Sequence, residues 1–181
     1  MKNKTTILFG ILLTVPLIVF IFYSSGFQET EAINNQDYAP ALIEEINQAY
    51  KSIHIAMFSI TYYDNYEDSS ANKILKALAD AKARGVDVKI VIDEYPDDHE
   101  KGVEFLQEHN ISVKYDGKSQ TTHAKLIIID SKTVILGSSN WRYYSLDKNN
   151  EANVKILSKV IAKEYEDYFQ QIWENGNNIQ N

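Results

Sequence analysis

The stretch TTHAKLIIIDSKTVILGSSN, residues 121–140, contains two apolar runs that are bounded by polar residues. Leu-Ile-Ile-Ile and Thr-Val-Ile-Leu are rich in β-branched side chains, and the Ser131-Lys132 dipeptide between them predicts a tight turn. The stretch therefore predicts a buried β-hairpin. The presence of polar residues at both ends of a buried hairpin needs an explanation, because burying a polar side chain without a hydrogen-bond partner costs free energy.

The polar residues at the ends of the hairpin have a regular spacing. His123 and Lys125 are two residues apart, so on a strand both side chains point to the same face. Ser138 and Asn140 repeat this spacing at the end of the second strand, which the turn brings alongside the first. Gly137 allows another backbone segment to approach closely there. We therefore expect these polar residues to gather at one end of the hairpin.

The rest of the chain predicts an α/β domain around this hairpin. Apolar residues recur at helical spacing in four segments, and strand-like runs separate them. The expected helices cover residues 40–50, 71–85, 99–110 and 158–173, and the expected strands cover residues 52–61, 86–93, 111–115 and 151–157. Strands that alternate with helices pair in parallel, whereas the hairpin adds antiparallel strands. We therefore expect a mixed, mostly parallel β-sheet flanked by helices.

The first 26 residues differ in composition from the rest of the chain. Lys2 and Lys4 precede an uncharged apolar run of 17 residues, Ile7–Tyr23, which is close to the roughly 20 residues that span a bilayer. Lysines before an apolar run also mark a signal peptide, and Ser24–Gly26 offers small residues for cleavage. We expect a retained transmembrane anchor or a cleaved signal, with a buried core helix as the third interpretation. Either of the first two places the remaining chain outside the cytoplasm, membrane-anchored or secreted.

Composition divides the 181 residues into four regions. They are a membrane anchor or signal segment at 1–26, a polar linker at 27–37, the α/β domain at 38–175 and a polar tail at 176–181.

The chain has no cysteine, which excludes disulfides, thiolate metal sites and a cysteine nucleophile. Its net charge of −7 becomes −9 without the first region, because that segment carries two lysines and no acid. This acidity argues against high-affinity, sequence-independent binding of nucleic acid, because such binding needs a basic surface.

The combined pattern HxKx4Dx6GSxN, which runs from His123 to Asn140, resembles the signature of the phospholipase D superfamily. The preceding ILKALADAKARGVDVKIVID, residues 74–93, is similar to the helix and strand that come before the motif in that family. The resemblance covers about residues 38–173 and contains one motif copy, as in small bacterial endonucleases and the membrane-anchored cardiolipin hydrolase group. Thr122 departs from the pattern, because many members carry an apolar residue there.

The resemblance implies a phosphodiesterase that needs no metal and no cofactor. It assigns His123 as the nucleophile that forms a phosphohistidine, which divides one difficult step into two. Lys125 supplies positive charge to the oxygens on phosphorus in the transition state, and Ser138 and Asn140 add hydrogen-bond donors to the same oxygens.

Two acidic residues complete the catalytic set that the resemblance implies. Glu151 matches the downstream acidic residue of the family, and we expect it to bond the second ring nitrogen of His123 and so to fix the tautomer. Asp130 is seven residues from His123, an odd offset that turns its side chain the other way on a straight strand. We therefore expect Asp130 to order the framework of the site.

A single motif copy has a consequence for assembly. One histidine cannot attack phosphorus and also protonate the leaving alcohol, so the second histidine must come from another copy of the chain. A two-fold axis places the same patch of each subunit at one point, so we expect a homodimer with one composite active site.

The expected substrate is a phospholipid, because an anchor would hold the site near a bilayer. The alternatives are a nuclease that cuts DNA or RNA by the same mechanism and a non-catalytic membrane-tethered scaffold.

Three other features receive structural interpretations. His54 lies in an expected strand, off its apolar face, and is expected to be structural. Asp97 and Asp98 are expected to cap the helix that follows them, with a divalent-ion site as the alternative. The tyrosine-rich segment 62–66 is expected to be an ordinary loop, with a place at the rim of the substrate groove as the alternative.

Overall fold

The structure is a computed structural model, and it describes residues 29–95, 99–117 and 120–179. The expected anchor or signal segment, 1–26, lies outside these ranges. Within them, no helix combines the length and the apolar composition that crossing a bilayer requires.

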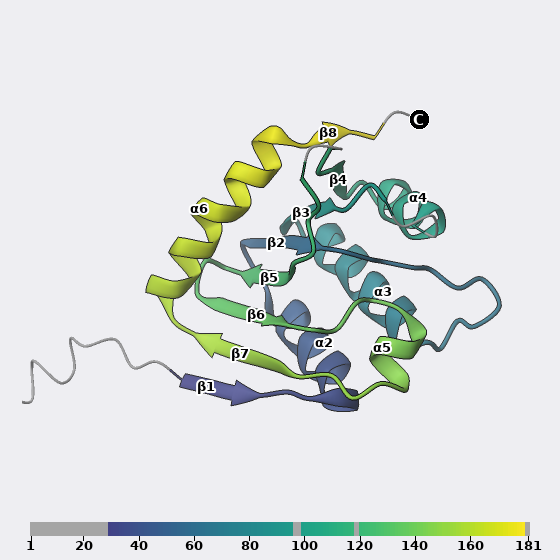
Figure 1. The fold of residues 1–181 in the computed structure, drawn as a ribbon, viewed down its shortest axis with the longest axis horizontal. Helices are drawn as coiled ribbons and strands as arrows, with labels where there is room; N and C mark the ends of the chain where they lie inside the picture. The colour runs from purple at the N-terminus through teal and green to yellow at the C-terminus, as the bar shows by residue number, and fades with distance from the viewer. Residues whose placement is uncertain (1–28, 96–98, 118–119, 180–181) are drawn as a thin grey trace, which may run out of the picture.

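A single mixed sheet of eight strands, in the order β1-β7-β6-β5-β2-β3-β4-β8, forms the centre of the described chain (Figure 1). The strands are β1 Glu29–Ala32, β2 Ser52–Met57, β3 Asp87–Ile92, β4 Ser112–Tyr115, β5 Lys125–Ile129, β6 Thr133–Gly137, β7 Asn153–Leu157 and β8 Asn177–Asn178. Parallel pairing joins β2 to β3 and β3 to β4. The other neighbouring strands in the described ranges are antiparallel.

The mixed sheet flanked by helices is confirmed, but the expectation that it is mostly parallel is wrong. The β5–β6 hairpin does not add to an outer edge of the parallel strands beyond β4. It pairs antiparallel with β2, and β7 and β1 then extend the sheet antiparallel on that side. Five of the seven strand pairings are therefore antiparallel, and four of these five lie on the side where the hairpin docks on the first strand of the parallel unit.

Helices cover both faces of the sheet. They are the 3-10 helix η1 Asn35–Asp37 and the α-helices α2 Tyr38–Gln48, α3 Ser70–Ala83, α4 Glu100–Glu108, α5 Tyr143–Asp147 and α6 Lys159–Asn175. Helices α2 and α3 lie together on one face, and α6 crosses the other face over β2, β5 and β6 (Figure 1). Serine side chains cap the N-termini of α3 and α6, since Ser69 accepts a hydrogen bond from the Asn72 amide and Ser158 accepts one from the Ile161 amide.

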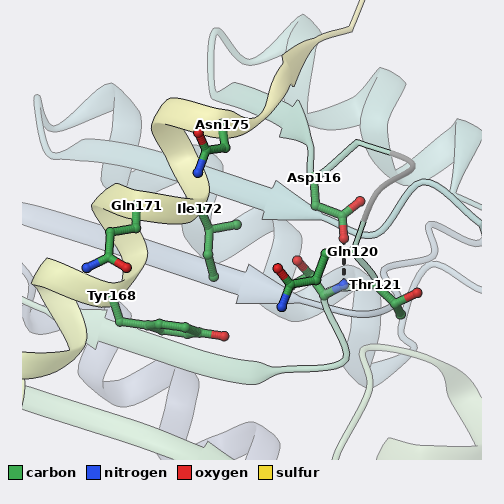
Figure 2. A pocket seen from close by; sticks show the side chains of 8 residues that line it. Asp116, Gln120, Thr121, Tyr168, Gln171, Ile172 and Asn175 are labelled. Atoms are coloured by element: carbon green, nitrogen blue, oxygen red, sulfur yellow. Dashed lines mark hydrogen bonds between the residues drawn. The ribbon is translucent and has the colours of Figure 1, made fainter.

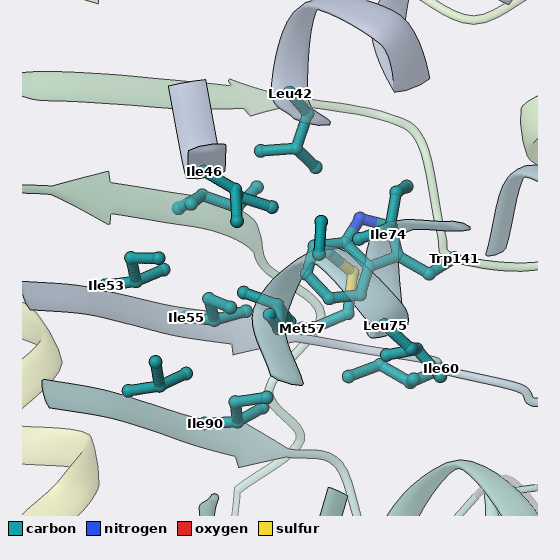
Figure 3. Close-up of a cluster of buried hydrophobic side chains, with 14 of the residues drawn as sticks. Leu42, Ile46, Ile53, Ile55, Met57, Ile60, Ile74, Leu75, Ile90 and Trp141 are labelled. Atoms are coloured by element: carbon teal, nitrogen blue, oxygen red, sulfur yellow. The ribbon is translucent and has the colours of Figure 1, made fainter. Parts of the chain in front are cut away.

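The hairpin is buried on both faces, which explains its continuous apolar run. Ile127 and Ile129 belong to the larger core, under α2 and α3, where Trp141 is the largest fully buried side chain (Figure 3). Leu126 and Ile128 belong to the smaller core, under α6. Alternate residues of one strand therefore fill two separate cores.

Both termini of the described chain join the sheet, although the sequence predicted a polar linker at 27–37 and a polar tail at 176–181. From Glu29 onward the linker segment forms β1, which pairs with β7, and η1 follows it. In the tail, β8 pairs with β4. All residues of β1 and β8 are exposed, so these segments lack the apolar alternation by which a strand is predicted.

Candidate active site

The head of β5 and the end of β6 meet at one edge of the sheet. The two strands pair antiparallel with Leu126 opposite Leu136, so the residues before β5 lie beside those after β6. Strand β2 ends at the same edge, because Met57 pairs with Lys125. Three chain segments that carry the polar signature or lead to it therefore converge here, and we call this place the catalytic edge.

His123 and Lys125 form the centre of the catalytic edge. The Lys125 Nζ atom lies 3.4 Å from His123 Nδ1 and donates a hydrogen bond to the His123 carbonyl oxygen at 2.9 Å. The Phe58 ring packs against both groups, with its centroid 4.5 Å from that of the imidazole and 4.9 Å from the ammonium. Lys125 is buried, whereas His123 is exposed. An accessible imidazole therefore lies beside a shielded positive charge.

The environment of Lys125 acts on its charge in two directions. Burial lowers the pKa of the Lys125 ammonium below its ordinary value, because an apolar surrounding disfavours the charged form. The carboxylates of Glu151 and Asp93 oppose this effect by attraction. The ammonium is thus held between apolar packing and two acids.

Ser138 and Glu151 bond to each other on the β6–β7 side of the edge. The Ser138 hydroxyl donates to the Glu151 carboxylate and accepts a hydrogen bond from the Ala152 amide at 3.1 Å. The Asn149 side chain donates to the other Glu151 oxygen at 3.2 Å. In the described ranges, no hydrogen bond joins Glu151 to His123, which corrects the expected contact. Glu151 lies two residues before β7, whose neighbour is β6, and it bonds the serine that directly follows β6.

Gly137 is required by a close approach of the backbone, although toward β7 and not toward His123. A Cβ atom at this position would collide with Asn153 and with the Ala152 carbonyl group. The Asn153 side chain uses this closeness, because it accepts from the Ser139 amide at 3.2 Å and donates to the Ser139 hydroxyl at 2.9 Å. Gly137 therefore sets the position of the segment that carries the signature serine and asparagine.

The segment that follows Ser138 is fixed by a buried tryptophan. The Trp141 amide donates to the Ser59 carbonyl oxygen at 3.0 Å, and its indole nitrogen donates to the Tyr38 hydroxyl at 3.1 Å. Asn140, one residue earlier, is half-buried, and its side-chain oxygen is buried without a hydrogen bond to any described residue. The short helix α5, which the sequence did not predict, begins two residues after Trp141.

Asp130 does not lie at the catalytic edge. Its carboxylate accepts hydrogen bonds from the amides of Lys51 at 2.8 Å, Ser52 at 3.1 Å and Tyr50 at 3.3 Å. Asp130 and Ser131 have φ values of 53° and 51°, the left-handed conformation that asparagine and aspartate tolerate better than most residues. The carboxylate thus ties the turn before β2 to the hairpin at the opposite end of the strands.

Two buried carboxylates that the sequence did not single out hold the head of β5. The Thr122 amide donates to Asp93 at 3.0 Å and to Asp116 at 2.5 Å. Burial raises the pKa of the Asp116 carboxyl, hydrogen bonds from Thr122 oppose the rise, and the nearby charge of Asp93 adds to it. Asp93 is the last residue of one predicted parallel strand (86–93) and Asp116 directly follows another (111–115), and polar residues at such strand ends were the available signal. They position the residue that precedes His123.

The remaining sequence interpretations concern places away from the edge. His54 lies between β2 and α6, with Nδ1 2.6 Å from Glu166 and its ring stacked on Phe169 at 4.9 Å, as a structural role requires. Asp97 and Asp98, the expected helix cap, lie outside the described residues. Among the described residues, no three His, Asp or Glu side chains are grouped so as to hold a metal ion.

Comparison with known protein families gives one match over most of the chain. Residues 42–173 match the family described as "Cardiolipin synthase, PLD-like domain". A protein named phospholipase D from Rickettsia bellii is 33% identical over 138 residues, which cover 73% of this chain and 60% of that protein. A mitochondrial cardiolipin hydrolase from Xenopus tropicalis is 24% identical over 128 residues, which cover 70% of this chain and 57% of that protein. The chain thus spans well under two thirds of the length of these relatives.

Solved structures share the fold over their whole length. Nuc from Salmonella typhimurium, described as a phospholipase D family member, has a TM-score of 0.75 and 27% identity, and the match covers 86% of this chain and 100% of that one. NucT from Helicobacter pylori has a TM-score of 0.71 at 23% identity, over 84% of this chain and 100% of that one, which supports the fold alone.

Proposed function

Since this chain belongs to the phospholipase D-like family, we propose that it hydrolyses phosphodiesters through a phosphohistidine on His123. The observation that carries the proposal is the exposed imidazole beside the shielded ammonium of Lys125, 3.4 Å away. A ring nitrogen of His123 attacks phosphorus, the bond from phosphorus to the leaving alcohol breaks, and an acid gives the alcohol its proton. Water then attacks the phosphohistidine and releases the phosphomonoester and the free imidazole.

The residues around His123 support particular roles in these steps. Lys125 places its positive charge where the oxygens on phosphorus gain negative charge in the transition state. Ser138, bonded to Glu151, and Asn140 are proposed to turn toward the same oxygens when substrate is bound. Phe58 limits the motion of the imidazole by packing against it. Asp130 has a framework role at the other end of the strand.

We further propose that a second copy of the chain supplies the acid. The chain carries one signature, and the catalytic edge offers one exposed histidine. In a two-fold dimer whose catalytic edges face each other, one His123 attacks while the other protonates the leaving alcohol and later activates water.

A subunit-mixing experiment tests the composite site. Wild-type chain and His123→Asn chain are refolded together in varied ratios, and the activity is measured against the wild-type fraction. If each site needs two histidines, activity follows the square of that fraction, because only wild-type pairs turn over. A linear dependence, or full activity in a monomer seen by analytical ultracentrifugation, would contradict the proposal.

The proposed substrate is a phospholipid, and a nucleic acid is the second candidate. Relatives named phospholipase D and cardiolipin hydrolase, together with the expected anchor, support the first. The single copy of the signature, which resembles that of small bacterial endonucleases, supports the second. Wild type and His123→Asn are assayed side by side on phosphatidylglycerol, cardiolipin, single-stranded DNA and RNA, with EDTA present. We expect one class to be cleaved by wild type alone and to leave an acid-labile phosphohistidine; turnover by the variant would refute the mechanism.

We also propose that residues 1–26 hold the domain at a membrane, on its extracytoplasmic side, or are removed during secretion. The apolar run of 17 residues after two lysines supports this proposal. Fractionation of expressing cells, followed by N-terminal sequencing of the mature chain, separates a retained anchor from a cleaved signal. Recovery of the full-length chain in the soluble cytoplasmic fraction would contradict both.

A further inference from the structure

Two consecutive asparagines lie beside the backbone that carries Glu151. They belong to the segment 33–35, which directly follows β1 and which we call the asparagine clamp. The Asn35 side chain accepts a hydrogen bond from the Glu151 amide at 2.8 Å, and the Asn35 amide donates to the Glu151 carbonyl oxygen at 3.1 Å. The Asn34 side chain accepts a hydrogen bond from the Asn153 amide at 3.0 Å. The clamp therefore holds the start of β7 and the residues just before it.

Side chains take over from the backbone here because the regular pairing of β1 with β7 ends. The last regular pair is Ala32 with Val154, and the Ile33 amide makes one more bond, to the Asn153 carbonyl oxygen at 3.0 Å. Asn35 then has a φ of 51°, the left-handed conformation that asparagine tolerates better than most residues, and the chain turns into η1. An asparagine side chain carries the same amide group as the backbone, so it continues the pairing where the backbone turns away.

The stretch that the clamp holds is in turn bonded to the segment that carries the signature serine. The Ser138 hydroxyl donates to Glu151, and the Asn153 side chain bonds both the amide and the hydroxyl of Ser139. The Asn153 side chain also donates to the Ile33 carbonyl oxygen at 3.3 Å, so it contacts the clamp and the signature segment at once. Hydrogen bonds thus run from the clamp, through the start of β7, to the serine of the signature.

A second contact links the same N-terminal region to the signature asparagine. Tyr38 opens α2 and is buried, and its hydroxyl accepts a hydrogen bond from the Trp141 indole nitrogen at 3.1 Å. Trp141 directly follows Asn140 in the sequence. Residues 33–38 are therefore connected to both signature side chains, the serine and the asparagine, that are proposed to face the oxygens on phosphorus.

The histidine half of the site has a different support. The Thr122 amide donates to Asp93 and to Asp116, and Figure 2 shows the bond to Asp116 as a dashed line. These two acids follow the parallel strands β3 and β4, on the other side of the sheet from the clamp. Loss of the clamp should therefore shift the serine half of the site, while His123 keeps its own support.

We propose that the asparagine clamp is a part of the active site that lies outside the signature, within the predicted polar linker 27–37. Asn34 and Asn35 act as positioning residues for the Ser138 hydroxyl, through the start of β7 that they hold. The inference rests on the proposed function, since the serine acts there on the oxygens of phosphorus. A misplacement of about 1 Å can cost on the order of a hundredfold in rate. Because the serine contact strengthens as charge develops in the transition state, its loss lowers kcat more than it raises KM.

Variants of the clamp test the proposal by separating kcat from KM. Asn34→Ala and Asn35→Gly each remove a side-chain acceptor, and glycine keeps the left-handed conformation at position 35. Asn34→Asp and Asn35→Asp keep an oxygen at the same place and should restore activity. The matched controls are Gln36→Ala, an exposed side chain next to the clamp, and Asn110→Gly, an exposed asparagine whose φ is 58°.

Turnover is measured well below the Tm of each variant, on phosphatidylglycerol, cardiolipin, single-stranded DNA and RNA. For the diester that wild type cleaves, Asn34→Ala and Asn35→Gly should each lower kcat roughly threefold to thirtyfold, with KM within about twofold of wild type. Both aspartate variants and both controls should stay within about twofold of wild type. A kcat equal to that of wild type in both clamp variants, an equal fall in Gln36→Ala, or a fall that neither aspartate variant reverses would overturn the proposal.

Hydrogen exchange distinguishes failure of this inference from failure of the proposed function. If wild type cleaves no diester, exchange of the Ser139 amide, followed by NMR, still reports whether the clamp holds the signature segment. Relative to the Ile90 amide of β3, which reports unfolding of the sheet, Ser139 should exchange at least about tenfold faster in Asn34→Ala than in wild type and in Gln36→Ala. Unchanged exchange of Ser139 in Asn34→Ala and in Asn35→Gly would reject the clamp, whether or not wild type is active.

Discussion

Replacing Asp130 with alanine should destabilise the fold without removing a reacting group. The carboxylate accepts hydrogen bonds from the amides of Lys51, Ser52 and Tyr50 at 2.8 to 3.3 Å. A buried amide that loses its acceptor costs about 1–3 kcal/mol, and water can reach some of these three, so we expect a loss of about 2–5 kcal/mol. Alanine at a φ of 53° adds about 1 kcal/mol more.

The same structure predicts a small effect of Asp130 on turnover. Asp130 is five residues beyond Lys125 along the strand, a separation of about 17 Å at the rise of a β-strand. For a domain of this size, the loss of stability should lower Tm by about 10 °C or more. At a temperature where the variant is folded, kcat should stay within about threefold of wild type, because the charge is far from phosphorus.

Asp130→Asn is the informative partner of this variant. Asparagine tolerates the left-handed conformation, and its single oxygen can replace Oδ1, which receives the two shorter hydrogen bonds. We expect a loss of about 1 kcal/mol, measured by thermal and urea unfolding, with activity retained. If Asp130→Asn kept the Tm of wild type but were as inactive as His123→Asn, the framework role of Asp130 would be refuted.

Three further changes test other parts of the structure. Lys125→Met should abolish turnover without lowering Tm at pH 7, because burial already disfavours the ammonium. In wild type the charged form of Lys125 is the active one. The kcat of wild type should therefore fall as pH rises through the Lys125 pKa, which lies below the ordinary lysine value. A Tm well below wild type would contradict this account. Gly137→Ala should push β7 away, lowering the free energy of unfolding by about 1–3 kcal/mol and kcat as well. The same change at Gly85, which has open space but a φ of +93°, should also destabilise the fold but leave kcat unchanged. Glu166→Gln should cost about 1–2 kcal/mol by weakening the 2.6 Å bond to His54, with kcat unaffected; equal unfolding curves would show that this bond contributes nothing.

The sequence by itself determined the polar signature of this protein and most of its helices and strands, but not β1, β8 and α5. The hairpin, the long helices and their serine caps follow from apolar periodicity and from residues within three or four positions of each other, which is local information. The two-residue spacing of His123 and Lys125 on a strand likewise required no tertiary structure to place them on one face. The odd offset of Asp130 correctly separated it from that pair.

Only the tertiary structure decided which distant segments meet. Antiparallel docking of β5 on β2, the capture of Asp130 by amides some eighty residues earlier, and the bond from Glu151 to Ser138 in place of His123 all depend on strand order. The hydrogen bonds from the Thr122 amide to both Asp93 and Asp116 arise where separate elements pack together. Such contacts are chosen by the packing of whole elements against two cores, and a pattern along one chain does not carry that information because many pairings bury the same apolar faces equally well.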